Sequence, residues 1–366
     1  MEQLKPLPSN TTKRVAYLEC LRAFASFFVI VNHTNSYVFQ AAVPGDSTWW
    51  LSILWYYLSK TAVPLYVMVS GACLLYRQDT YRQVGLRIAR MLAVLVLFSY
   101  AYYLAALWQT HWDWRRVVDL PGFFYAIWRE RITDSFWYLY FYIGLLLMLP
   151  LLQRLAANLQ KKDLRYLLLC SFGIGGLWPL LVHYAPMLQF PQYTYAPLFS
   201  VFIGLFFAGH YLHFFASLTR RNDWLWGILL VGSLFVASAL TRLEAARLPT
   251  GAKYWFMDDR MSPSITILLC AMSLMYFFRR IQANRRISFV RRPAVKRFLL
   301  TLGRCSFGVY LLQDLLIAQT RYRIFEVLRA AIHPMVAAIL WELLVYVLAA
   351  LLAWLLMRVK WLQKLI

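Results

Sequence analysis

The run ECLRAFASFFVIVNH, from Glu19 to His33, lies inside the first hydrophobic segment of the chain, Val15 to Phe39. An apolar segment of this length can cross a bilayer as a helix. It nevertheless carries the ionisable residues Glu19, Arg22 and His33. An arginine at the centre of a membrane helix costs roughly 2.5–3.5 kcal/mol on insertion scales, so ionisable residues at that depth mark a functional site by default.

Helical periodicity places Arg22 and His33 on the same side of this helix. Their sequence separation is close to three full turns, so both side chains project from one face, roughly 16 Å apart along the axis. Glu19 precedes Arg22 by one helical turn, a spacing at which neighbours can pair. The alternative interpretation is a snorkelling arginine and a core histidine bonded to a neighbouring helix. The presence of all three residues on one helix favours a functional site.

The composition is typical of a polytopic helical membrane protein. The chain has 366 residues, of which 61% are hydrophobic, 17% aromatic and only 15% charged. Apolar runs of about 18 or more residues recur along it, which predicts an all-α fold that spans the membrane. The net charge of +22 would suggest nucleic-acid binding in a soluble protein. Here the basic residues lie between the spans, so membrane topology accounts for them and no nucleic-acid partner is expected.

We expect a single membrane domain over residues 1–366, with about ten transmembrane helices and both termini in the cytoplasm. The basic residues are concentrated in the loops that this topology places in the cytoplasm, as the positive-inside rule requires. The first segment lacks the features of a cleavable signal peptide and stays in place. The predicted spans are Val15–Phe39, a second ending in Ala62–Tyr76, a third ending near Trp108, a fourth beginning at Phe136, Tyr166–Tyr184, Ala196–Phe215, Trp224–Leu240, Ser262–Phe278, Cys305–Thr320 and Val336–Met357.

The first segment resembles the opening helix of the integral-membrane acyltransferase 3 family. The signature of that helix is an arginine, ten residues and a histidine, which Arg22 and His33 match. The Arg-x-x-Arg at Arg87 and Arg90 matches a second signature, at the start of the third helix. The resemblance implies that Arg22, Arg87 and Arg90 bind the acyl-CoA donor. The alternative for Arg87 and Arg90 is that they anchor the helix among lipid headgroups.

Three more segments, in the second, fourth and ninth predicted spans, match patterns of the family and follow one another in the family's order. The second helix contains a proline–aromatic–Ser-Gly pattern with Ser70, although Ser70-Gly71 can also serve ordinary helix packing. The fourth helix opens on the pair Trp137-Tyr138, which suits an aromatic belt at the membrane surface. The resemblance implies that such a tryptophan–aromatic pair lines the catalytic cavity, which makes Trp137 a candidate.

The ninth span, CSFGVYLLQDLLI, departs from the family at one position. Tyr310 fits the family pattern, whereas Gln313 stands where a histidine is common. Asp314 and, in the tenth span, Glu342 are carboxylates inside the membrane. Each either packs against a polar partner or lines the acceptor cavity. Ser70, Trp137, Tyr310, Gln313 and Asp314 are therefore the candidates for the cavity wall.

Acyl transfer from a thioester to a hydroxyl requires removal of the hydroxyl proton and stabilisation of an oxyanion. Imidazole has a suitable pKa, so His33 is the predicted base, and Glu19 joins it in the candidate catalytic set. A covalent acyl-histidine intermediate is the open alternative. The extended pantetheine arm is about 15–20 Å long, which matches the rise from Arg22 to His33.

The resemblance implies transfer of an acyl group, with acetyl expected, from cytoplasmic acyl-CoA to a cell-surface glycan or its lipid-linked precursor. The expected location is the bacterial inner membrane, among membrane lipids, with acyl-CoA as donor substrate and no permanently bound cofactor. The competing function is a polysaccharide exporter or flippase of the same fold, which an internal inverted repeat would favour. No metal site is expected, because the five cysteines are scattered singly along the chain: Cys20, Cys73, Cys170, Cys270 and Cys305.

Overall fold

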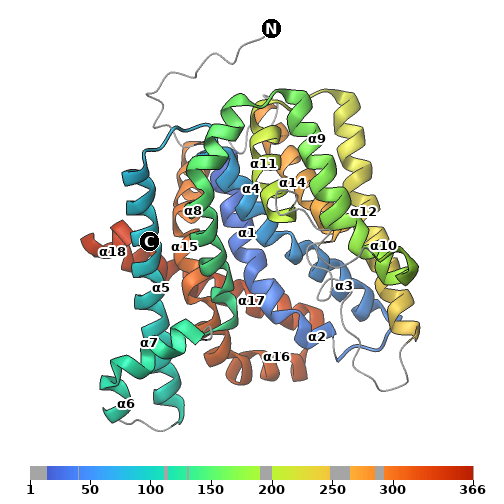
Figure 1. The fold of residues 1–366 in the computed structure, drawn as a ribbon. Helices are drawn as coiled ribbons and strands as arrows, with labels where there is room; N and C mark the ends of the chain where they lie inside the picture. Colours follow the sequence, from blue (N-terminus) through green and yellow to red (C-terminus); the bar gives the residue numbers. More distant parts are fainter. Residues whose placement is uncertain are drawn as a thin grey trace.

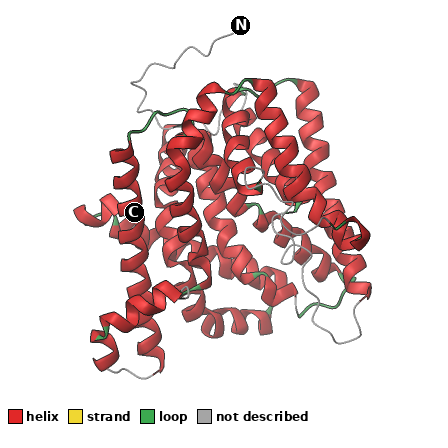
Figure 2. Ribbon diagram, viewed as in Figure 1, coloured by secondary structure: helices red, strands yellow, loops and turns green. Residues whose placement is uncertain are grey.

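The computed structural model describes residues 15–39, 41–110, 114–129, 132–189, 200–247, 264–284 and 292–365. Within these residues it contains helices and no strand, as Figure 2 shows. The prediction of an all-α polytopic membrane protein is confirmed. The α-helices are α1 (Ala16–Thr34), α2 (Ser36–Phe39), α3 (Ser47–Lys60), α4 (Ala62–Leu74), α5 (Tyr81–Thr110), α6 (Trp114–Val118), α7 (Leu120–Arg129), α8 (Trp137–Asn158), α9 (Lys161–Phe172), α10 (Trp178–Tyr184), α11 (Val201–Phe214), α12 (Arg220–Arg247), α14 (Ile265–Ala283), α15 (Pro293–Thr320), α16 (Glu326–Ala331), α17 (Pro334–Leu356) and α18 (Lys360–Leu365).

Seven helical segments of the described chain are long and apolar enough to cross a membrane. They coincide with the predicted third, fourth, fifth, seventh, eighth, ninth and tenth spans. The segments are Tyr81–Gln109, Asp134–Asn158, Lys161–Tyr184, Arg220–Arg247, Ile265–Ala283, Pro293–Ala331 and Pro334–Leu356.

The other three predicted spans coincide with α1, α4 and α11. The helices α4 and α11 have 13 and 14 residues, so each is only about 20 Å long, against a hydrocarbon core of about 30 Å. The total of ten crossings and the orientation stay predictions. Residues 1–14, whose basic side chains favour a cytoplasmic N-terminus, lie outside the described residues, as do the predicted starts of the sixth and eighth spans at Ala196 and Ser262.

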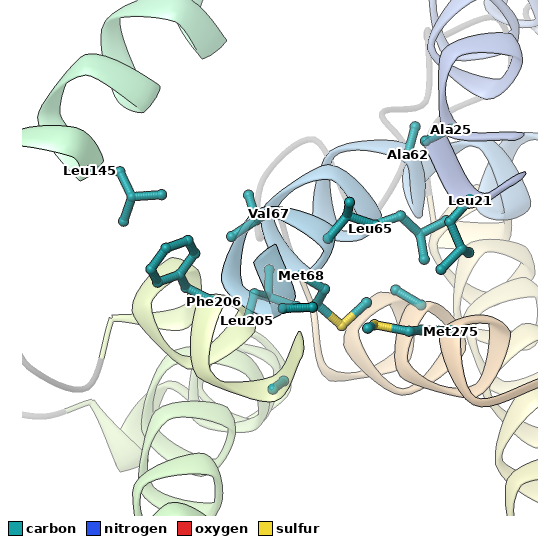
Figure 3. Packing of buried hydrophobic residues seen from close by; sticks show 14 of the residues in the cluster. Leu21, Ala25, Ala62, Leu65, Val67, Met68, Leu145, Leu205, Phe206 and Met275 are labelled. Atoms are coloured by element: carbon teal, nitrogen blue, oxygen red, sulfur yellow. The ribbon is translucent and has the colours of Figure 1, made fainter. Parts of the chain in front are cut away.

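The central element is α1, which packs against α15, α4, α3, α17 and α14. Figure 1 shows it in the middle of the bundle, with its N-terminal half between α15 and α4. Its Leu21 and Ala25 are fully buried. In Figure 3 they face Leu65 of α4, and Met275 of α14 lies beside the same cluster. The surrounding helices thus remove the polar side chains of α1 from lipid, as the cost of exposing them demands.

From the sequence, Pro64 should kink the second predicted span, but the structure divides this span into two helices. The chain instead ends α3 at Lys60 and starts α4 at Ala62, with Thr61 between them. Pro64 therefore lies in the first turn of α4. A proline is tolerated there because the N–H groups of the first turn have no partner within the helix.

The helices α4 and α11 approach each other closely through two glycines. A Cβ atom added at Gly71 would lie 1.8 Å from the carbonyl oxygen of Phe206, and one added at Gly209 would lie 1.8 Å from that of Met68. The approach is thus backbone to backbone, the arrangement that small residues permit between membrane helices. Gly71 therefore serves helix packing, one of the two roles considered for Ser70-Gly71.

Gly209→Ala should destabilise the protein strongly, because its added methyl group would overlap a backbone carbonyl that cannot move independently of α4. We expect a loss of about 1–3 kcal/mol or more, seen as a lower midpoint of thermal unfolding in detergent.

Gly85→Ala is the matched control. Gly85 is exposed on α5, and a Cβ atom there would meet nothing within 4 Å. Alanine should be neutral or stabilise the helix by about 0.5–1 kcal/mol. Equal midpoints for the two variants would show that α4 and α11 are not in close contact.

Candidate functional site

Glu19 and Arg22 form an ion pair in the N-terminal half of α1. The Arg22 Nη1 lies 2.6 Å from Glu19 Oε1, and the Glu19 side chain is only 4% exposed. Gly303 of α15 makes room for the pair, since a Cβ atom there would lie 2.6 Å from Glu19 Oε2. The second guanidinium nitrogen of Arg22 is 3.5 Å from the Cys73 sulfur on α4. The ion pair therefore lies where α1, α4 and α15 meet.

His33 lines a cavity of about 210 Å³. The charged groups that act on its imidazole are Asp314, Lys60 and Asp134. Asn32 also reaches this cavity, and its buried Oδ1 has no hydrogen-bond partner among the described residues. We call this space the inner cavity; it is lined by Val29, Asn32, His33, Ser59, Lys60, Ala62, Val63, Pro64, Tyr66, Ser135, Trp137, Tyr138, Phe202 and Tyr310.

Three tyrosines form much of the wall of the inner cavity. The ring centroid of Tyr138 lies 6.1 Å from that of Tyr66 and 5.8 Å from that of Tyr310. The Tyr310 hydroxyl donates to the carbonyl oxygen of Ser135 at 2.7 Å, which fixes its ring. Trp137 and Tyr310, both predicted for the cavity wall, lie there in the structure.

The polar wall continues from the inner cavity toward Arg22 and Arg87. Tyr142 stacks on Tyr138 with ring centroids 6.0 Å apart. Ser70 hydrogen-bonds with both tyrosines. The charges of Arg22 and Arg87 both act on Tyr142. Ser70, Tyr138 and Tyr142 therefore lie between the arginines and the cavity that contains His33.

Arg87 and Arg90 both have partners in this structure. Arg87 Nη1 lies 2.9 Å from Asp79 Oδ2, and its Nη2 donates to Oδ1 of the same carboxylate at 3.0 Å. Nη1 is close enough for an ion pair but not aligned for a hydrogen bond. The exposed Arg90 donates from Nε to the carbonyl oxygen of Leu365 in α18 at 3.0 Å. A phosphate group would have to compete with Asp79 and with α18.

Glu19 lies apart from His33 in this structure. It lies more than two helical turns along α1 from the residues that line the inner cavity, and it is not one of them. Its carboxylate instead holds the guanidinium of Arg22. Its position is that of a residue that orients Arg22, and its place in the catalytic set stays a prediction.

The polar residues of the ninth and tenth predicted spans differ in whether their side chains have hydrogen-bond partners. Gln313 is fully buried, and neither atom of its amide has a partner among the described residues. Asp314 Oδ2 accepts a hydrogen bond from Thr133 at 2.8 Å. Glu342 is fully buried and bonded to both Thr34 (2.8 Å) and Trp55 Nε1 (2.9 Å). Glu342 therefore packs against polar partners, one of the two roles we had left open.

Lys60, Tyr66 and Tyr138 belong to the inner cavity but were not among the predicted site residues. Lys60 is a cation at the end of an apolar run, so the rule that selected Arg22 would also have selected it. Tyr66 lies one turn before Ser70 on α4 and shares its face. Tyr138 follows Trp137 directly, and its sequence position is equally suited to an interfacial aromatic and to the cavity wall. No three His, Cys, Asp or Glu side chains of the described chain are grouped as metal ligands.

Comparison with known proteins agrees with the motifs and the fold. No curated protein and no solved structure matches this chain. The model of the acyltransferase 3 family, described as an acyltransferase domain, matches residues 15–358, nearly the whole chain. That range contains α1 with Arg22 and His33 as well as the apolar helices around it. The chain therefore belongs to the acyltransferase 3 family and is a multi-pass membrane acyltransferase, which supports transfer of an acyl group to a hydroxyl.

Proposed function

We propose that this protein transfers an acetyl group from cytoplasmic acetyl-CoA to a hydroxyl of a cell-surface glycan or its lipid-linked precursor. The observation that carries the proposal is the position of His33 on a small polar cavity, at the opposite end of α1 from Arg22. The acyl donor enters from the side of the arginines, and its thioester reaches His33. The protein works in this scheme in the inner membrane of a bacterium.

His33 is the general base in the proposed reaction. Its imidazole takes the proton of the acceptor hydroxyl while the hydroxyl oxygen attacks the thioester carbonyl carbon. The carbon–sulfur bond then breaks, and the imidazolium returns the proton to the leaving thiolate. Lys60 and the hydroxyl of Tyr66 are donors on the same cavity wall that could stabilise the oxyanion. Attack by His33 itself, forming an acyl-histidine, is the alternative order of events.

The size of the inner cavity favours a small acyl group. Pockets that enclose a whole drug-sized molecule measure about 300–1,000 Å³, whereas this cavity measures about 210 Å³. It can hold the reacting ends of two substrates, an acetyl thioester and a hydroxyl, better than a polysaccharide in transit. This volume speaks against the exporter alternative.

Arg22, Arg87 and Arg90 bind the phosphates of the donor in this proposal. A guanidinium can bind a phosphate through two parallel hydrogen bonds, as Arg87 already does with the carboxylate of Asp79 in approximate form. Asp79 thus occupies the position of the phosphate when no donor is bound. Arg22 lies next to the inner cavity, since its carbonyl oxygen is 3.5 Å from the hydroxyl of Tyr66 on the cavity wall, and there it can follow the pantetheine arm.

His33→Ala should reduce acyl transfer by a factor of about 10²–10⁴, the usual contribution of a general base. The assay follows radiolabel from acetyl-CoA into glycan in membrane vesicles, at donor concentrations raised to saturation. No donor concentration should restore the rate, because the variant lacks the proton acceptor.

His183→Ala is the control for His33→Ala. His183 lies in α10, outside the inner cavity, and contacts Glu244. Its loss should leave transfer near the wild-type rate. Wild-type transfer by a well-inserted His33→Ala protein would remove His33 from the chemistry.

Arg87→Ala should raise the KM for acetyl-CoA roughly ten- to a hundredfold, since losing a charge-assisted hydrogen bond costs about 1.5–3 kcal/mol. Binding interactions of similar strength in the ground state and the transition state affect KM more than kcat. Saturating donor should therefore restore most of the turnover, and Arg87→Lys should recover only part of the affinity. We expect the same pattern for Arg90→Ala.

Asp79→Asn separates the two possible roles of Arg87. It removes the competing negative charge, so the KM for acetyl-CoA should stay equal or fall if Arg87 binds phosphate. If Arg87 only anchors the helix through this ion pair, Asp79→Asn should impair the protein as much as Arg87→Ala does. That result would end the donor-binding proposal for this residue.

A further inference from the structure

A second, larger cavity lies at the far side of the bundle from Arg87, between α5, α7 and α15. Its volume is about 630 Å³, within the range of pockets that enclose a whole small molecule. We call it the outer cavity. The polar residues on its wall are Tyr102, Tyr103, Gln109, Tyr125, Arg129, Thr133 and Asp314. In Figure 1, α7 lies beside the lower end of α5.

The inner and outer cavities share a thin wall. Thr133 lines the outer cavity and Ser135 the inner one, although only one residue separates them in the sequence. On α15, Tyr310 lines the inner cavity and Asp314 the outer one, one helical turn apart on the same face. The hydrogen bond from Thr133 to Asp314 joins these two strips of wall at 2.8 Å. The charge of Asp314 acts on His33.

The chemistry of the outer cavity suits an anionic saccharide. Arg129 is exposed, and the hydrogen bond it makes within the described chain is to the neutral Tyr125 hydroxyl at 3.0 Å. Its guanidinium is thus available to bind a phosphate or carboxylate through two hydrogen bonds. Tyr103 and Tyr125 present amphipathic rings to the cavity, and the Asp314 carboxylate can accept a hydrogen bond from a sugar hydroxyl.

We propose that the outer cavity is the acceptor site and that it binds a saccharide with an anionic group near the reacting sugar. Arg129 binds the anion, Tyr103 and Tyr125 contact the ring, and Asp314 orients the hydroxyl toward the inner cavity. The site opens beside α7, whose Trp128 is 91% exposed, as expected of an aromatic side chain at a membrane interface. This inference rests on the proposed transferase function and assigns the acceptor to a cavity distinct from the one that contains His33.

Two kinds of acceptor present a sugar with an anionic group near it: a lipid-linked glycosyl phosphate and an acidic polymer. Membrane vesicles of the producing cell, with their native glycans, are the acceptor source, and radiolabelled acetyl-CoA is the donor. Extraction with organic solvent separates labelled lipid-linked saccharide from labelled polymer. Label in either fraction is consistent with the site, and the fraction identifies the source. If Arg129→Ala reduces the label in neither fraction, the proposed acceptor site is contradicted.

The test compares Arg129→Ala, Arg129→Lys and Ala105→Trp in the full-length protein. Arg129→Ala should lower transfer at least tenfold at saturating donor, and Arg129→Lys should recover part of the rate. Ala105 is half-buried on the cavity wall, so tryptophan there should fill the space and nearly abolish transfer. All three variants should keep the wild-type affinity for acetyl-CoA, measured by binding to the purified protein.

Ala101→Trp is the matched control, because Ala101 is exposed on the same helix and does not line the outer cavity. It should transfer at the wild-type rate. Wild-type rates in both Arg129→Ala and Ala105→Trp would show that lipid alone fills the cavity and would overturn this inference, while leaving the transferase proposal intact. A wild-type protein that binds acetyl-CoA but acetylates nothing would instead defeat the transferase proposal.

Discussion

The structure depends on one constraint, the need to keep an ion pair and an imidazole inside a membrane bundle. Glu19 and Arg22 neutralise each other at 2.6 Å, but a paired charge in lipid still loses its hydration. Five helices therefore surround α1, and a glycine on α15 lets its backbone come up against Glu19. The same enclosure leaves His33 facing a small polar space rather than lipid. The central position of α1 and the existence of the inner cavity follow from the same physical cause.

Most of the fold could be predicted from the sequence because apolar length is a local property. Seven of the predicted spans are helices long enough to cross the membrane. The break at Thr61 was harder to foresee, because a proline marks either a kink or the first turn of a new helix. The packing of the short helices α4 and α11 likewise depends on contacts between helices and not on the local sequence. They pack backbone to backbone at Gly71 and Gly209, and a glycine in a sequence does not reveal which carbonyl will approach it.

The candidate site could be predicted where its residues share one helix and not where they meet across helices. The spacing of Arg22 and His33 is set by helical geometry alone. The cluster of Tyr66, Tyr138 and Tyr310 comes from α4, α8 and α15, and no periodicity within one helix places these rings 6 Å apart. The ion pair of Arg87 with Asp79 could not be predicted from helical spacing either. The two residues are eight positions apart, and Asp79 lies in the loop before α5. It matters for the proposed role of the Arg-x-x-Arg motif, because a donor phosphate that binds Arg87 would have to displace the carboxylate of Asp79.

The buried polar residues divide into those that hold the fold and those that lack partners. Glu342 is bonded by Thr34 and Trp55 and thereby ties α17 to α1 and α3. Asn32 and Gln313 instead carry buried amide atoms with no partner among the described residues. A buried group without a partner costs about 1–3 kcal/mol, and a packed bundle gains nothing from that cost. Asn32 lies on the inner cavity, and Gln313 follows Tyr310 by one turn on the same face of α15. The unmet hydrogen bonds of these two amides thus lie on or next to the space where His33 would meet both substrates, and a bound substrate or water there would satisfy that of Asn32.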